Sequence, residues 1–141
     1  MTKVLVLHGQ GMELRGKVDI EIFGTMTLPE YDEHIRRYAS DVGVDVEIFH
    51  SNEEAEVIAK LKDSDADAAL INPGGYTTGH PALADTIRQG SIPTLEVHMS
   101  NPASRGRVSE IGPACKGVIT GLGIVGYRLG LQAASELAAK P

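Results

Sequence analysis

Two ionisable side chains, Glu96 and His98, are two residues apart in the short apolar segment 93–98. Alternate side chains of a β-strand point to the same side, so a strand here would place the carboxylate next to the imidazole. A carboxylate can orient a neighbouring imidazole and stabilise its protonated form, which makes a competent proton donor. The pair therefore predicts a general acid with its positioning group, and a salt bridge at the end of a strand is the alternative.

Polar, glycine-rich segments follow two other apolar segments. The first is His8-Gly9-Gln10-Gly11, and the second is Asn72-Pro73-Gly74-Gly75-Tyr76-Thr77-Thr78. Each alone is also typical of an ordinary tight turn. In open α/β sheets, however, ligands bind beyond the carboxyl ends of neighbouring strands. We therefore expect these two segments and the segment after His98 to meet in one cleft.

The elements that must position these residues alternate along the chain. Apolar segments predict five strands, over residues 4–8, 44–49, 68–72, 93–98 and 117–120. Helical spacing predicts helices over residues 28–42, 54–61, 81–89 and 123–139. Thr27 and Ser51 are each followed three residues later by glutamate, which predicts two capping boxes. In the second helix we expect Ala55, Ile58 and Leu61 to face the core.

Strands that alternate with helices indicate a parallel sheet covered by helices on both faces. We predict a single domain over residues 1–141 with a flavodoxin-like, three-layer α/β fold. The expected strand order is 2-1-3-4-5, which makes the first, third and fourth strands neighbours. The segment 44–49 alternates apolar and charged residues, as expected of a strand near an edge.

Composition excludes several functional classes. The chain has 13 Lys and Arg against 19 Asp and Glu, a net charge of −6, which is not the charge of a nucleic-acid-binding protein. No apolar run approaches the roughly 18 residues of a membrane span, and we expect no signal peptide and a cytoplasmic location. Cys115 is the only cysteine, so an intrachain disulfide is impossible and a cysteine-based zinc site is not expected.

Two patterns suggest ligands that we do not expect. Gly121, Gly123 and Gly126 match the dinucleotide-binding fingerprint, but the strand with an acidic residue that should follow has no room in the sequence. These glycines are better explained by close packing of a helix on the sheet. His8, His50, His80 and His98 have no metal-ligand spacing, so we expect no metal.

The loop sequences resemble type II 3-dehydroquinate dehydratases over essentially the whole chain. The matching stretches are Leu-His-Gly-Gln-Gly (7–11), Glu-Ile-Phe-Gly-Thr (21–25), His-Ser-Asn-Glu (50–53), Ile-Asn-Pro-Gly-Gly-Tyr-Thr (71–77), Ile-Pro (92–93), Glu-Val-His-Met-Ser-Asn (96–101), Gly-Val-Ile-Thr-Gly-Leu-Gly (117–123) and Gly-Tyr (126–127). The resemblance implies a flavodoxin-like fold, no cofactor, a small carboxylated substrate and a homo-oligomer, a dodecamer of four trimers.

In that family, water is eliminated from a cyclic keto acid. A loop tyrosine, assisted by a loop arginine, removes a proton next to the ketone, and a histidine oriented by a glutamate protonates the leaving hydroxyl. An enolate forms between these steps and is stabilised near an asparagine. The resemblance assigns the acid to His98 and its orientation to Glu96. The substrate-binding positions that it implies are Asn72, Gly75, Met99, Ser100 and Arg105.

The sequence departs from the family pattern in the half of the site that removes the proton. The tyrosine base falls on Phe23, which has no hydroxyl, and the loop arginine falls on Val18. The enolate-site asparagine is Gly11, a histidine that contacts the ring is Thr78, and a second substrate arginine is Ser109. We therefore expect a related small carboxylated keto or hydroxy compound as the substrate.

Other polar residues are candidates to replace the missing groups. Glu13 or Arg15 could supply a base or an anion contact, although such a residue is more often a solvated loop residue. His8 is a further candidate because it lies near the expected site. His80 could either replace the missing histidine or cap the third helix.

Three functional hypotheses follow. The first is a dehydroquinase-like lyase, or a hydrolase, acting on a related compound. The second is a true 3-dehydroquinate dehydratase with a substitute base. The third is a non-catalytic oligomer that binds small acids.

Overall fold

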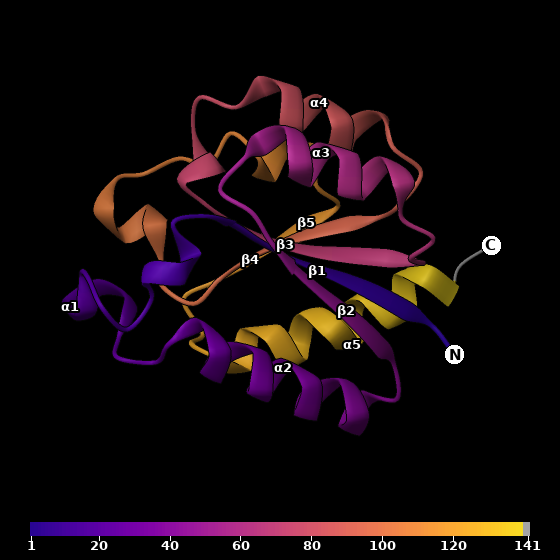
Figure 1. Cartoon of the computed structure of the whole chain (residues 1–141), viewed down its shortest axis with the longest axis horizontal. Helices are drawn as coiled ribbons and strands as arrows, with labels where there is room; N and C mark the ends of the chain where they lie inside the picture. The colour runs from indigo at the N-terminus through magenta and orange to yellow at the C-terminus, as the bar shows by residue number, and fades with distance from the viewer. Residues whose placement is uncertain (140–141) are drawn as a thin grey trace.

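The computed structural model describes residues 1–139, which form one parallel sheet between two layers of helices (Figure 1). The strand order is β2-β1-β3-β4-β5, as predicted. The strands are β1 (Lys3–Gln10), β2 (Asp45–His50), β3 (Ala68–Gly74), β4 (Thr94–His98) and β5 (Gly117–Thr120). The three-layer α/β fold inferred from the alternating pattern is therefore confirmed.

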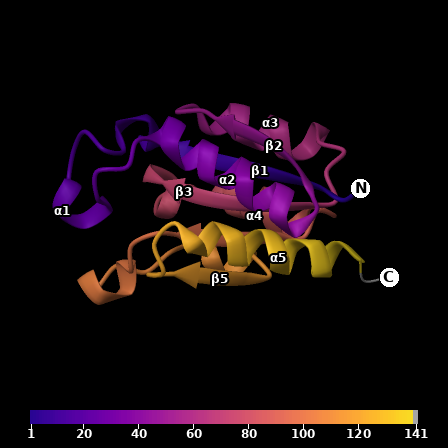
Figure 2. The same ribbon diagram turned by 90° about the horizontal axis from the view of Figure 1, so that it is seen from below.

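Helices cover both faces of this sheet. The helices α2 (Leu28–Val42) and α5 (Val125–Ala139) pack side by side on one face, and α3 (Glu54–Asp63) and α4 (Pro81–Gln89) pack on the other (Figures 1 and 2). Alternate residues of the central strands supply the two cores. Val4 and Val6 of β1 pack under α2 and α5, whereas Leu5 and Leu7 pack under α3 and α4.

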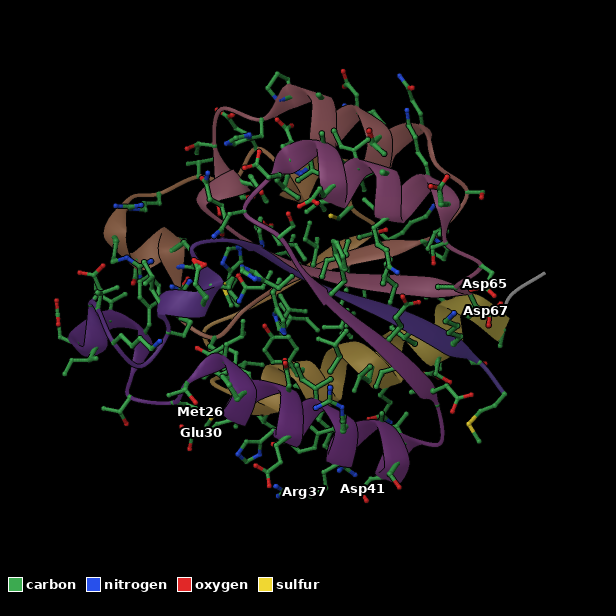
Figure 3. All side chains as sticks on the ribbon, viewed as in Figure 1. Met26, Glu30, Arg37, Asp41, Asp65 and Asp67 are labelled. Atoms are coloured by element: carbon green, nitrogen blue, oxygen red, sulfur yellow. The ribbon has the colours of Figure 1, made fainter. Side chains whose placement is uncertain are left out.

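The carboxyl ends of the strands form the edge at which short elements gather. The short helix α1 (Ile20–Phe23) projects from this edge, and the segment after β4 lies beside it (Figure 1). Asp65 and Asp67 lie at the opposite edge, where both carboxylates bond to Lys3 at the start of β1 (Figure 3). These charged contacts therefore lie at the end of the sheet away from the candidate site.

Local sequence explains how α2 begins. The Thr27 hydroxyl accepts a hydrogen bond from the Glu30 amide at 3.4 Å, and the Glu30 carboxylate accepts one from the Thr27 amide at 3.0 Å. This is the capping box that the sequence predicts. Gly43 ends the helix with a φ of 88°, a conformation that glycine adopts without strain.

The second predicted capping box is wrong. Helix α3 begins at Glu54 with Glu53 at the cap position and no capping side chain. The Ser51 hydroxyl instead accepts from the Glu53 amide and contacts the Glu56 carboxylate. Of the three residues predicted to face the core, Leu61 is buried and Ile58 is partly buried against it, whereas Ala55 is exposed and Val57 is buried instead. The helix α1 was not predicted, because its four residues are too few to show helical spacing.

Candidate active site

Glu96 and His98 lie next to each other at the carboxyl end of β4. Strand alternation places both side chains on one side, and His98 Nε2 donates to Glu96 Oε2 at 2.9 Å. Glu96 is fully buried, and His98 is 7% exposed at the edge of a cleft. The ring nitrogen that does not bond to Glu96 is therefore the one available to a ligand.

Ser109, at the position that the resemblance assigns to a second substrate arginine, binds the carboxylate of this pair. Ser109 Oγ donates to the same Glu96 oxygen at 2.6 Å. The Ser109 oxygen in turn accepts from the backbone amides of Ile111 and Gly112, each at 3.1 Å. These bonds fix the carboxylate, and through it the imidazole, without a second ionised group.

Glycines allow the ends of β1 and β3 to approach closely. A Cβ at Gly9 would overlap the Pro73 carbonyl, and a Cβ at Gly74 would lie 2.5 Å from the Gln10 carbonyl oxygen. Gly74 also has a φ of 54°, which favours glycine. The two loop tips and the end of β4 therefore meet at one edge, as the sequence predicts.

A cleft of about 540 Å³ opens where these ends meet. Three arginines line it: Arg15 before α1, and Arg105 and Arg107 after β4. Among the lining residues in the described chain, Asp19 is the one carboxylate. An otherwise acidic protein thus presents a cationic cleft beside His98, which favours a small anionic ligand.

Phe23 forms a wall of this cleft. The Arg15 guanidinium lies 3.8 Å from the centre of the Phe23 ring, and the Arg105 guanidinium lies 5.8 Å from it. Stacking of this kind holds a guanidinium in a defined place. Val18 lies in the same wall. The positions that the resemblance assigns to a tyrosine and an arginine thus face the cleft, where they offer only apolar surface.

The inner end of the cleft narrows to a small recess. Asn72, Met99 and Ser100 line this recess together with His98, so the substrate-binding positions implied by the resemblance lie beside the acid pair. Gly75 and Arg105 line the outer cleft. A Cβ at Gly75 would lie 2.4 Å from Gln10 Oε1, so a larger residue there would displace the Gln10 side chain, which also lines the cleft.

Three candidate substitutes lie outside the lining of the cleft. His8 is fully buried beneath the sheet edge, where its Nε2 lies 2.7 Å from Asp32 Oδ1 of α2. Glu13 turns away from the cleft and accepts from Asn52 Nδ2 at 2.8 Å. Asn52 also accepts from the Gly11 amide at 2.8 Å, so these contacts fix the first loop.

His80 fills neither of its expected roles. Its side chain makes no capping bond to α4, and it lies outside the cleft with Nδ1 3.1 Å from Glu54 Oε1. The Glu54 carboxylate caps α4 instead, because its other oxygen accepts from the Leu83 amide at 3.0 Å. Of the four suggested substitutes, Arg15 is the one that reaches the cleft.

Several residues that line the cleft and its recess were missed in the sequence. Tyr31 lines the inner recess, but its place in the helical repeat indicated only a core residue. Asp19 and Arg107 line the outer cleft from irregular segments that carry no periodic signal. Asp19 has a φ of 49°, and it is the one residue other than glycine with a positive φ between residues 1 and 139.

The two patterns that suggested ligands have structural explanations. Gly126 is buried against the sheet, since a Cβ there would lie 3.5 Å from Ile119 and 3.7 Å from Val97. The packing role expected of these glycines holds for Gly126 alone, whereas Gly121 and Gly123 have positive φ values of 81° and 66° in the turn between β5 and α5. Within residues 1–139, no three His, Cys, Asp or Glu side chains come together as metal ligands, and no helix is long and apolar enough to cross a bilayer.

Comparisons with known proteins agree with this geometry. The family Dehydroquinase class II matches residues 2–135. The 3-dehydroquinate dehydratase of Desulforudis audaxviator is 40% identical over 143 residues, covering 98% of this chain and 95% of that protein. The type II dehydroquinase of Butyrivibrio crossotus superposes with a TM-score of 0.89 at 29% identity, covering 95% of this chain and 97% of that one.

A second crystal structure, the type II dehydroquinase of Propionibacterium acnes, gives a TM-score of 0.86 at 30% identity, covering 99% of this chain and 98% of that one. The agreement extends over nearly the whole length of both chains. Taken with the glutamate–histidine pair at the end of β4, it shows that the chain belongs to the class II dehydroquinases, a family of lyases.

Proposed function

We propose that this protein is a cofactor-free hydro-lyase that eliminates water from a small cyclic hydroxy-keto carboxylic acid. The name shared by its relatives makes 3-dehydroquinate the first substrate to assay. The observation that carries the proposal is the buried Glu96–His98 pair, with the imidazole opening onto an arginine-lined cleft. Such a pair can deliver a proton while the arginines bind an anion.

In the proposed reaction, a base removes the proton next to the ketone, and the electron pair moves into an enolate. The enolate then expels the hydroxyl from the neighbouring carbon as a carbon–carbon double bond forms. His98 gives its proton to the departing oxygen, so water leaves and the removed proton stays on the base. Glu96 holds the imidazole in position, and Ser109 holds Glu96.

Asp19 is our candidate for the base. Phe23 cannot accept a proton, and Glu13 is held away from the cleft by Asn52. Asp19 supplies the one carboxylate on the cleft lining within the described residues, at the start of the short α1. Its carbonyl oxygen accepts from the amides of Ile22 and Phe23, which fixes the backbone that carries it.

A related substrate is the second candidate, and the Arg15–Phe23 stack favours it. Phe23 and Val18 form an apolar wall where the family pattern has a tyrosine and an arginine, so the surface that would face the ring of a substrate is less polar. A cyclic acid with a different pattern of hydroxyl groups would suit that wall. Screening keto and hydroxy acids of this size on the same purified protein distinguishes the two candidates.

The decisive assay follows the absorbance of the conjugated enone product formed from 3-dehydroquinate. We expect turnover by the unmodified protein and a loss of about 10²- to 10⁴-fold in His98→Ala. The matched control is His34→Ala, because His34 lies on α2 outside the cleft. Binding of the substrate without turnover would instead indicate a binding protein, and unchanged turnover in His98→Ala would assign the acid elsewhere.

We also propose that the protein is a homo-oligomer, and a dodecamer of four trimers is the arrangement that the resemblance suggests. In support, β5 is an edge strand, and three neighbouring apolar side chains beside it are 41–51% exposed. They are Leu122, just before α5, and Val125 and Leu129, one helical turn apart on α5. Exposed apolar groups of this kind are common at subunit interfaces.

A further inference from the structure

The first loop, residues 11–19, lines much of the outer cleft and leads into α1 (Figure 1). Its lining residues are Gly11, Leu14, Arg15, Val18 and Asp19. Leu14, Val18 and Asp19 are exposed to solvent, and exposed loops are more mobile than the elements they connect. Contacts that fix this loop therefore determine where the Arg15 guanidinium lies.

Asn52, in the segment between β2 and α3, bonds to the first loop on both sides of Met12. Its Oδ1 atom accepts from the Gly11 amide at 2.8 Å, and its Nδ2 atom donates to Glu13 Oε2 at 2.8 Å. Met12 itself is fully buried in the core under α2 and α5. The loop is therefore held from two sides, by a core side chain and by the amide of one exposed asparagine.

The segment that carries Asn52 is itself fixed. The Ser51 carbonyl accepts from the Tyr76 hydroxyl at 3.1 Å, and the Ser51 amide donates to the His8 carbonyl at 3.4 Å. Tyr76 is 1% exposed, so the first of these bonds is shielded from water. His50, at the end of β2, also faces the loop, with Nε2 3.6 Å from Glu13 Oε2. The first loop is thus anchored to a segment that is tied to β1 and to the end of β3.

The direction of Arg15 follows from this anchor. A single 3-10 turn over Met12–Leu14 leads into Arg15. The Arg15 amide donates to the Met12 carbonyl at 3.1 Å, which sets the direction of the backbone there. The Arg15 guanidinium reaches the cleft and lies 3.8 Å from the centre of the Phe23 ring. A displaced turn would therefore move both the cation and the ring stacked on it.

We propose that Asn52 is a positioning residue for the proposed reaction. By holding Gly11 and Glu13, it keeps Arg15 where the guanidinium can bind an anionic substrate, although neither Asn52 nor Glu13 lines the cleft. The role of the anion rests on the proposed function, whereas the anchoring of the loop does not. Loss of Asn52 should therefore lower the affinity for an acid only through Arg15.

Limited proteolysis with trypsin, which cleaves after arginine and lysine, tests the anchor. Arg15 and Lys17 are cleavage sites on the loop, and Arg107 on another exposed segment is a reference site in the same molecule. In Asn52→Ala, mass spectrometry should show cleavage after Arg15 or Lys17 about 10-fold faster than in the unmodified protein, with cleavage after Arg107 unchanged. Gln89→Ala, at the exposed end of α4, is the matched control. Equal rates in Asn52→Ala and the unmodified protein would overturn the proposal.

An exchange of donor and acceptor tests the bond between Asn52 and Glu13. Asn52→Asp alone should speed cleavage of the loop, because two carboxylates would then face each other. Adding Glu13→Gln should restore slow cleavage, since the introduced amide can donate to the introduced carboxylate, which still accepts from Gly11. A double variant that is cleaved as fast as Asn52→Asp would contradict the anchoring bond.

Calorimetric titration with quinate, a cyclic hydroxy acid with no ketone, tests the link to Arg15. We expect Asn52→Ala to weaken quinate binding about 10-fold, but less than about 2-fold in the Arg15→Met background, because two changes that act through one contact are not additive. Equal losses in both backgrounds would overturn the positioning role. No binding of quinate by the unmodified protein would overturn the link to an anion, and with it the proposed function, while the cleavage rates still decide the anchor.

Discussion

Ser109 and His98 both donate a hydrogen bond to the Oε2 atom of Glu96, at 2.6 Å and 2.9 Å. The serine arrives from the loop before β5, thirteen residues after the glutamate, and two backbone amides hold it in place. The orientation of the imidazole therefore depends on a loop as well as on β4. The resemblance assigns a substrate-binding arginine to this position, yet the serine here supports the acid from behind.

Replacing Ser109 should weaken catalysis without removing any group that contacts the substrate. We expect Ser109→Ala to lower kcat/KM about 10-fold, because loss of such a supporting bond to a reacting group typically costs that much. The pH profile of kcat should shift, whereas KM should stay nearly constant. Ser91→Ala, on an exposed loop at the other end of β4, is the control. A proportional rise in KM with an unchanged pH profile would contradict the positioning role.

Asp19→Asn should remove the base while keeping the size of the side chain. We expect kcat to fall by about 10²- to 10⁴-fold in the enone assay, with substrate binding by calorimetry preserved. Asp63→Asn, at the end of α3, controls for the change in net charge. Turnover of Asp19→Asn at the level of the unmodified protein would exclude this carboxylate as the base.

Introducing a tyrosine hydroxyl at position 23 should recover part of the activity lost in Asp19→Asn. We expect Phe23→Tyr combined with Val18→Arg to raise 3-dehydroquinate turnover in the Asp19→Asn background, because both positions face the cleft. Phe23→Tyr alone should give a smaller gain. If the double change has no effect, the cleft has been rebuilt for another substrate, and the screen of related acids becomes the primary experiment.

Cys115 should react slowly with alkylating reagents in the folded protein. Burial raises the pKa of its thiol to about 12, and the nearby Glu96 carboxylate adds to the rise, so thiolate is scarce at pH 8. Mass spectrometry after iodoacetamide treatment should show modification at least 10-fold faster in denaturant. The thiol of free cysteine in the same buffer is the reference, and equal rates in the folded chain would contradict the prediction.

Thr27→Ala should destabilise the start of α2. Loss of the capping hydroxyl is expected to lower the free energy of unfolding by about 1 kcal/mol in urea titrations. The two bonds from Thr27 hold the pKa of Glu30 below its usual range, so the stability they add is present above the ordinary glutamate pKa and is lost as pH falls through the lowered value. The difference between the variant and the unmodified protein should therefore shrink in acid.

A charge in the exposed apolar group beside β5, formed by Leu122, Val125 and Leu129, should disrupt assembly. We expect Leu122→Glu to reduce the molar mass measured by light scattering, because burying an unpaired carboxylate in an interface is strongly unfavourable. Ala59→Glu, on the exposed side of α3, should leave the mass unchanged. A monomeric unmodified protein would refute the proposed oligomer directly.

Sequence patterns predicted the sheet and the acid pair because both depend on local periodicity. Alternation along β4 was enough to place Glu96 beside His98, and alternating strands and helices predicted a parallel sheet, whose order follows the flavodoxin-like fold. His8 was misplaced because only its position at the end of a strand was considered, whereas alternation along β1 puts it on the face of Val4 and Val6. It points under α2 and α5, where it meets Asp32.

The resemblance placed Phe23 and Val18 at the site, but other residues of the cleft wall could not be predicted because they come from irregular segments. Asp19 depends on a positive φ, and Tyr31 was assigned to the core because a helical repeat does not show that its hydroxyl end reaches a recess. Ser109 reaches Glu96 only through the loop that leads into β5. Such contacts are set by tertiary packing, which leaves no periodic trace in the sequence.

The close approach of Gly9 to Pro73 divides the site into two parts with different tolerance to mutation. Main-chain atoms shape the floor, so almost any side chain introduced at Gly9 would push β1 and β3 apart. The outer wall is made of side chains, and part of it lies on the loop that carries Asp19 and Phe23. Exchanging that loop would therefore change the substrate preference and the candidate base together, while the scaffold and its proton donor are inherited intact.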